Sequence, residues 1–334
     1  MRQSWGLSLL LGLCWLSPKA QGARVATAPQ AVLRLEGGIY APQLSSNSRY
    51  LAYTDAEGLS LRVLDLNSQD VVELSRGKVG PSFLWTPDGN RLFFRELLRE
   101  GKNLNTHIKV FDATLQKISE IQTIEGSSGY LSFDPRSYKL YLVHEHGLYQ
   151  QQLEYPTRTR PKWTQKPGLP YVVWIATQKA MLQLKDGGLT WETIPDDGSG
   201  VQSFAVSPDG QSLAWATEAK NLYMKQSADA KPILIGKGRD PAWHPYRSLL
   251  VYAAARMIGP KVFDYDLRVL DLKGQTRYLQ QTPQLAERWP VWLDSDTILY
   301  TAEAATDLLR LRLTPEVPTP PPSAPIASAH EPKP

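Results

Sequence analysis

Cysteine is almost missing from this chain of 334 residues, which has only Cys14. A single cysteine cannot form an internal disulfide, so stability has to come from packing. The sequence also contains no N-x-S/T glycosylation site. Secreted eukaryotic proteins of this size usually carry disulfides, so an exported chain of this kind is expected to be bacterial.

The excess of positive over negative charge is also small. The chain has 37 Lys and Arg residues against 33 Asp and Glu residues, a net charge of +4. Without residues 1–22, which include Arg2 and Lys19, the net charge falls to about +2, too small for a nucleic-acid binder. No apolar run approaches the roughly 20 residues that a membrane-spanning helix needs.

The sequence lacks the usual motifs of catalysis. It has no G-x-S-x-G nucleophile elbow, no phosphate-binding glycine loop, no H-E-x-x-H and no cysteine-based metal site. His144 and His146 could share a face, but two histidines without a third ligand make a poor metal site, and a hairpin turn is the simpler interpretation. We therefore expect a protein that is not an enzyme and that needs no cofactor or metal.

The N-terminus has the pattern of a secretory signal peptide. Arg2 precedes a mostly apolar run at 7–16, and the small-residue pattern Ala20-Gln21-Gly22 follows. This predicts cleavage before Ala23 and export to the periplasm. The alternative is a lipid anchor on Cys14, although lipoprotein signals usually place a small residue before that cysteine and Leu13 stands there.

The C-terminal segment 314–334 contains eight prolines in 21 positions. Such a composition cannot bury enough apolar surface to fold, so we expect a disordered tail. It is either inert or a polyproline segment that forms a second contact with a partner.

A repeat of strand, tight turn and strand occupies the rest of the chain. It is clearest at 83–94 and 204–215, and less strict at 44–53. In the first two, Pro presets φ at the second turn position, Gly supplies a positive φ, and the preceding Thr or Ser can bond to the turn backbone. Weaker copies lie at 133–141, 242–252, 291–300 and, degenerate, from 171–174.

The spacing of these copies, 32 to 49 residues, is typical of four-stranded propeller blades of about 40 residues. Second strands such as 213–216 are apolar on both faces, as expected for sheets covered on both sides. Most tryptophans fall on strands and are predicted to pack in the core rather than to form a sugar-stacking platform.

We therefore predict an all-β fold, a β-propeller over 23–313. It has seven blades, or six if 171–198 is an insertion. The last repeat, 288–313, has room for three strands, and the segment 31–36 is predicted to supply the missing outer strand. That pairing would close the ring and hide its edges.

The S-P-D-G turn at 207–210 and the T-P-D-G turn at 86–89 resemble the propeller repeats of the TolB family, over about residues 38–313. The resemblance implies a periplasmic, non-enzymatic role in contacts among envelope proteins. It does not extend to the separate N-terminal domain of TolB, since only about 15 residues lie between the signal peptide and the first repeat.

The two longest connections between second and third strands, at 95–106 and 256–264, are predicted to be loops on one face, together with 144–147. Long loops on a rigid scaffold often bind partners, and basic residues there suit an acidic partner surface. The predicted partner-binding residues are Arg95, Arg99, Lys102, His144, His146, Arg256 and Lys261.

The expected function is a periplasmic scaffold for protein–protein interactions in a bacterial envelope assembly. The alternative is a propeller enzyme of the lactonase or lyase kind, or a glycan-binding protein, acting at the central channel. That alternative requires a ring of carboxylates, histidines or a bound cation at the channel mouth.

Overall fold

The computed structural model describes residues 28–35, 37–134, 138–144, 147–153, 171–174, 180–185, 188–193, 197, 199–208, 212–227, 230–280, 285–302 and 306–313. Across these ranges all regular structure is β-strand. Accordingly, the described part of the chain has no helix long and apolar enough to cross a membrane. The predicted signal peptide, Cys14 and the proline-rich tail lie outside the described residues.

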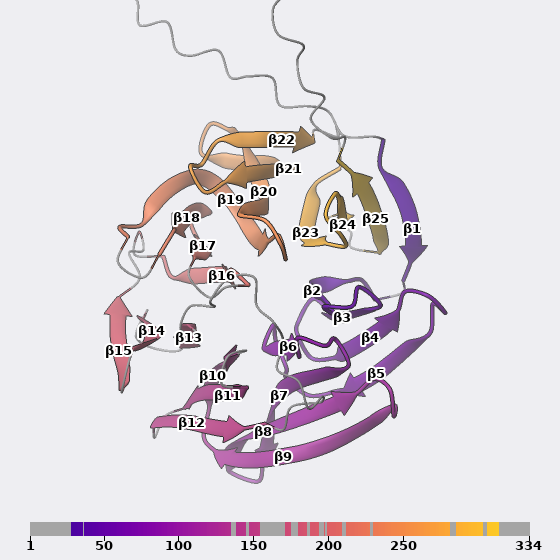
Figure 1. The fold of residues 1–334 in the computed structure, drawn as a ribbon, viewed down its shortest axis with the longest axis vertical. Helices are drawn as coiled ribbons and strands as arrows, with labels where there is room; N and C mark the ends of the chain where they lie inside the picture. The colour runs from indigo at the N-terminus through magenta and orange to yellow at the C-terminus, as the bar shows by residue number, and fades with distance from the viewer. Residues whose placement is uncertain are drawn as a thin grey trace, which may run out of the picture.

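The strands form antiparallel sheets arranged around a common centre (Figure 1). One sheet contains β2 (Tyr40–Leu44), β3 (Tyr50–Thr54), β4 (Leu61–Asp65) and β5 (Val71–Ser75). The next contains β6 (Phe83–Trp85), β7 (Arg91–Glu100), β8 (Asn103–Asp112) and β9 (Lys117–Glu125). Two three-stranded sheets follow: β10 (Ser128–Asp134), β11 (Lys139–His144) and β12 (Gly147–Gln152), then β13 (Tyr171–Trp174), β14 (Ala180–Lys185) and β15 (Gly188–Thr193).

The next seven strands are joined in one sheet by a shared long strand. They are β16 (Val201–Val206), β17 (Leu213–Thr217), β18 (Asn221–Lys225), β19 (Ile233–Trp243), β20 (Leu249–Ile258), β21 (Lys261–Asp271) and β22 (Thr276–Gln280). The first half of β19 pairs with β18 and its second half pairs with β20. At this junction Gly238 has no room for a side chain, since a Cβ there would lie 2.7 Å from the Ala253 carbonyl oxygen.

The remaining sheet joins the two ends of the described chain. It contains β23 (Glu287–Trp292), β24 (Thr297–Ala302), β25 (Asp307–Arg312) and, beyond β25, β1 (Gln30–Arg34). The fold is therefore a β-propeller, as predicted. The strand expected at 171–174 is present as β13, while the count of seven blades stays a prediction.

The tight turns have the predicted chemistry. In the turn between β6 and β7, Gly89 has φ +71° and donates its N–H to the Thr86 carbonyl oxygen at 2.8 Å. The Thr86 hydroxyl accepts the N–H of Arg91 at 3.1 Å, and the Ser207 hydroxyl accepts that of Ser212 at 2.8 Å. The residue before Pro thus fastens each turn.

The second strands are covered on both faces, which explains their lack of polar alternation. All residues of β3, β17 and β24 are buried. In β7, Phe94 packs in a cluster with the β2–β5 sheet, whereas its neighbour Phe93 packs with Leu140 of β11. Alternate residues of one strand therefore stabilise contacts with the preceding and the following sheet.

The first and last sheets are joined in three ways. β1 pairs antiparallel with β25, at 30–34 rather than the predicted 31–36 (Figure 1). Leu33 of β1 packs on a buried cluster that includes Leu51 and Leu308. In addition, the Ser48 hydroxyl donates to the Leu293 carbonyl oxygen at 2.7 Å.

The prediction of long loops at 95–106 and 256–264 is wrong. Both segments continue the strands, so β7 with β8 and β20 with β21 form extended hairpins whose residues pair almost to the tip. Backbone hydrogen bonds between the two arms provide order that the sequence of these segments does not indicate.

Leu33→Asp should lower the free energy of unfolding by about 2 kcal/mol, because it places a carboxylate in the cluster that joins β1 to the first and last sheets. Urea unfolding followed by tryptophan fluorescence measures the change. Leu115→Asp is the matched control, since Leu115 is 70% exposed and should tolerate the same substitution. Equal losses in the two variants would contradict the role of β1.

Candidate functional site

The innermost strands of the ring surround a cavity of about 1740 Å³, which we term the channel. Its wall comes from β2, β6, β10, β16, the second half of β19, and β23. One end is lined by the tight turns after these strands, for example 45–48 and 244–248, and we term it the turn face. The opposite end, lined in part by 55–58 and carrying the β7–β8 and β20–β21 tips, is the hairpin face.

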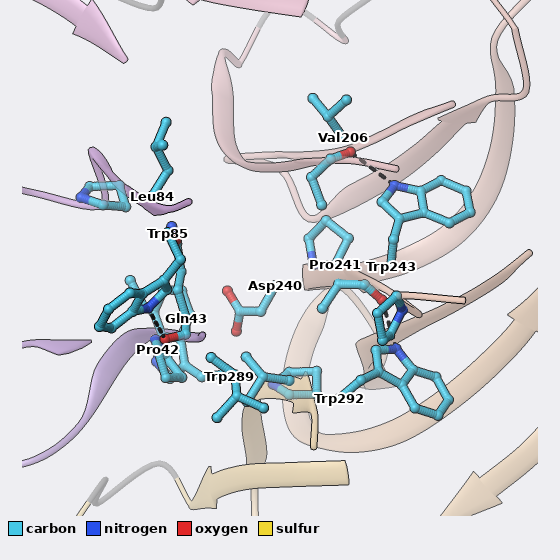
Figure 2. Close-up of a pocket in the computed structure, with 18 of the residues that line it drawn as sticks. Pro42, Gln43, Leu84, Trp85, Val206, Asp240, Pro241, Trp243, Trp289 and Trp292 are labelled. Carbon is cyan, nitrogen blue, oxygen red and sulfur yellow. Dashed lines mark hydrogen bonds between the residues drawn. The ribbon is translucent and has the colours of Figure 1, made fainter. Parts of the chain in front are cut away.

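Three tryptophans tie neighbouring inner strands together along the channel wall (Figure 2). The indole N–H of Trp85 donates to the Gln43 carbonyl oxygen at 3.1 Å, and that of Trp243 donates to the Ala205 carbonyl oxygen at 3.0 Å. Trp292 repeats the contact with the Ala242 carbonyl oxygen at 3.2 Å. Each bond satisfies an inner-strand carbonyl, so these residues stabilise the wall, as the core-packing prediction requires.

His244 fastens a turn at the turn face. Its Nδ1 accepts the N–H groups of Tyr246 and Arg247, both at 2.9 Å, and its Nε2 donates to the Ser295 carbonyl oxygen at 3.1 Å. The ring is 1% exposed and contacts the edge of Trp292. Both nitrogens are engaged in the neutral form, and burial lowers the pKa of His244 below 6.5.

Three inner strands carry the same β-bulge at the hairpin-face end of the channel. In each, a residue with positive φ stands before a proline: Ala41 (φ 46°), Asp240 (φ 53°) and Trp289 (φ 52°). The pairing skips this residue and its proline, which lie opposite one buried tyrosine. The three tyrosines are Tyr53, Tyr252 and Tyr300.

Such backbone is strained, since a positive φ costs about 1–3 kcal/mol for a residue with a side chain. A following proline further restricts the backbone angles that the residue before it can adopt. Proline suits the bulge because it has no N–H to lose from the ladder. Bulges re-aim side chains, and Figure 2 shows Asp240 and Trp289 among the residues that line the channel.

Asp240 is the centre of an ion cluster on this part of the wall. Arg288 donates its Nε–H to Asp240 Oδ2 at 2.6 Å, and Arg239 donates to Oδ1 at 3.3 Å. Both guanidinium groups lie over the rings of Tyr265 and Trp289, with distances of 5.1 to 5.9 Å to the ring centres. The Asp240 side chain is 2% exposed and that of Arg288 is 8% exposed, so the pair is held in a desolvated setting.

A second ion cluster contains Arg256, Asp264 and Asp266. The Arg256 Nε donates to Asp266 at 3.1 Å, and its Nη1 lies 3.6 Å from Asp264. The hydrogen bond with Asp266 is the main reason that the pKa of Arg256 is raised. Arg256 thus lies on β20 and is engaged by internal carboxylates rather than lying in a loop. Its role in binding an acidic partner stays a prediction.

Arg95 is not an exposed loop residue either. It is 8% exposed on β7, and its guanidinium lies 5.7 Å from the ring centre of Tyr130. Burial lowers the pKa of Arg95. By contrast, Arg99, Lys102 and Lys261 are exposed at the hairpin face.

Of the two histidines His144 and His146, the structure describes His144. His144 ends β11 and pairs with Gly147 of β12, so the predicted connection between two strands is present there. His146 lies outside the described residues. Considering only the described ranges, no group of three or more His, Cys, Asp or Glu side chains could hold a metal ion.

The sequence reasoning missed Asp240, Arg239 and Arg288. The sequence carried a signal for the bulge alone, because the proline of an inner-strand X-Pro pair precedes a tyrosine by ten or eleven residues in each of the three bulged strands. That spacing marks the residues that the bulge turns toward the channel.

No protein-family model and no curated protein matches the chain. Among solved structures it is similar to TolB from Acinetobacter baumannii, with 15% identity and a TM-score of 0.51 over 79% of this chain and 59% of that one. It is also similar to the Cps50 (Swd1) β-propeller domain of Myceliophteria thermophila, with 13% identity and a TM-score of 0.52 over 86% and 100% of the two chains. A chain of the Mitotic Checkpoint Complex gives 13% identity and 0.52 over 94% and 98%.

These likenesses show the β-propeller fold. The chain spans less than two thirds of the length of the TolB structure. Membership of the TolB family stays a prediction that rests on the turn motifs.

His244→Ser should make stability less dependent on pH between 7.5 and 5. The folded pKa of His244 is depressed, so the unfolded chain takes up a proton first as the pH falls through about 6.5, and the native protein loses stability. Serine does not titrate and suits the position, as Ser207 shows in its own turn.

Urea midpoints measured at several pH values for both proteins test this prediction. The groups near the ring that also act on its pKa are Arg247, Asp294 and Asp296. Parallel curves for the two proteins would show that His244 is not the titrating group.

Proposed function

We propose that the chain is a non-enzymatic protein-binding scaffold that works in a bacterial periplasm as part of an envelope assembly. The observation that carries this proposal is the length of two hairpins. β7, β8 and β20 have ten residues and β21 has eleven, whereas β3, β4, β17 and β18 have five. The extra length is not needed to build the ring.

Both long hairpins connect a second strand to a third, so they project from the same face, on opposite sides of the ring (Figure 1). The β20–β21 tip presents Ile258 and Phe263, which are 62% and 63% exposed. Large apolar side chains held this far into water on an ordered hairpin are typical of an interaction surface. Lys261 beside them, and Arg99 and Lys102 on the other tip, favour an acidic rim on the partner.

The channel supports a macromolecular partner over a small substrate. Its volume of about 1740 Å³ exceeds the roughly 300–1,000 Å³ of sites that enclose small molecules. Three of the aromatic groups on its wall, Trp85, Trp243 and Trp292, are occupied in tying strands together through their indole N–H groups. A sugar-stacking or catalytic role would require such groups to face a substrate.

The periplasmic setting is supported by the signal-like segment before Ala23 and by the S-P-D-G turns, which resemble those of the TolB family. The fold likeness to TolB is in agreement with it. On this proposal the partner is another envelope protein.

A photo-crosslinking amino acid at position 263, introduced in the producing bacterium, should give a discrete adduct with a partner protein. The same probe at position 115 should give none, because Leu115 is exposed at the opposite face, in the turn between β8 and β9.

The double variant Ile258→Glu/Phe263→Glu should reduce recovery of that partner at least tenfold, since two buried apolar contacts contribute on the order of 3 kcal/mol at an interface. Leu115→Glu serves as the control. Unchanged recovery from the double variant would contradict the proposed hairpin surface.

A further inference from the structure

Positive charge gathers at the hairpin-face end of the channel, around Lys220. This residue lies in the turn between β17 and β18, and its carbonyl oxygen accepts the Gly238 N–H of β19 at 2.7 Å. Its ammonium group donates to the Gln202 side-chain oxygen at 3.0 Å. Gln202 and Arg239 both line the channel, so Lys220 is joined to the wall beside the Asp240 cluster.

Two arginines lie close enough to Lys220 to act on its charge. The pKa of Lys220 is lowered, first by burial and then by the positive charges of Arg239 and Arg288, while Asp240 and Glu218 act in the opposite sense. Lys220 and the two arginines therefore repel one another, and Asp240 and Glu218 act against this repulsion. An anion placed among these groups would relieve their mutual repulsion.

Free donors are available to such an anion. Within the described part of the chain, Arg239 makes one hydrogen bond, through Nε to Asp240 Oδ1. Its other guanidinium N–H groups belong to a side chain that is 15% exposed, and Lys220 has three ammonium hydrogens of which Gln202 accepts one. The stacking of Arg239 over Tyr265 and Trp289 orients the guanidinium in advance.

We infer that Lys220 and Arg239, positioned by Gln202 and Asp240, form a carboxylate-binding site at the hairpin-face end of the channel. A carboxylate carries one negative charge, whereas a phosphate carries about 1.5 to 2. Because the Asp240 carboxylate already bonds Arg239, it repels the ligand with the smaller charge less. As a planar group, a carboxylate also fits the fork of an arginine.

The inference deepens the proposed function and rests on it for the source of the ligand. The site lies on the face that carries the exposed hairpin tips. A partner docked on this face can therefore place the carboxylate of an acidic side chain or of its chain end in the site. The other source of a carboxylate is a free small acid.

Isothermal titration of the mature chain at low salt, with hexaglutamate, glutarate and inorganic phosphate as probes, tests the inference. At least one carboxylate probe should bind more tightly than phosphate. Tighter binding of hexaglutamate than of glutarate assigns the site to a protein segment, and the reverse order assigns it to a free acid. Lys220→Gln and Arg239→Gln should each weaken that binding about tenfold.

Lys237→Gln is the matched control, because Lys237 is an exposed lysine nearby on β19 whose ammonium donates to the Ala219 carbonyl oxygen. It should change the affinity less than twofold. Circular dichroism and the urea midpoint verify that each variant is folded, and Lys220→Gln, at a surface turn, keeps the test valid if Arg239→Gln unfolds.

The inference is overturned if neither carboxylate probe binds, if phosphate binds most tightly, or if Lys220→Gln binds as well as the native chain. Such a result together with an intact crosslink at position 263 would remove the carboxylate site and leave the scaffold. Loss of that crosslink with retained carboxylate binding would remove the scaffold proposal and leave the carboxylate site.

Discussion

The fold depends on one constraint, which is that second strands such as β3, β17 and β24 are buried on both faces and so need a sheet on each side. In β3, β17 and β24 no residue is exposed to water. A row of such sheets would leave an apolar face bare at each end, whereas a ring leaves none. The contacts among Leu33, Leu51 and Leu308 cover the apolar faces of the first and last sheets, where the two ends of the described chain come together.

The same geometry builds the channel and its strained residues. Inner strands that converge on a common centre are edge strands, and their backbone groups need partners other than a further strand. The indole N–H groups of Trp85, Trp243 and Trp292 supply some of these partners. The bulges at Asp240 and Trp289 turn the chain where an inner strand begins, and the ion cluster forms there because the bulge brings side chains from separate sheets together.

Features encoded over a few residues were predictable, and features that depend on distant residues were not. Pro87 and Gly89 specify their turn by their own φ preferences, so the repeat and the fold class followed from them. The extended hairpins were missed because the segment 97–105 is polar and mixed, and its order comes from backbone pairing between two arms. Arg288 and Asp240 lie 48 residues apart, and no local pattern links them. The X-Pro pairs were visible but their first residues, Ala41, Asp240 and Trp289, share no chemistry that marks a site.

The most direct test of the closed ring is a disulfide across its seam, since a Cys14→Ser chain offers no competing thiol. Arg34 lies opposite Asp307 in the pairing of β1 with β25, whereas Arg312 lies five residues further along β25. Facing residues of antiparallel strands are within reach of a disulfide. Under mild oxidation Arg34→Cys/Asp307→Cys should form the bond almost completely and Arg34→Cys/Arg312→Cys should not, as read by gel mobility and peptide mass. Equal oxidation of the two pairs, or none in the first, would contradict the account.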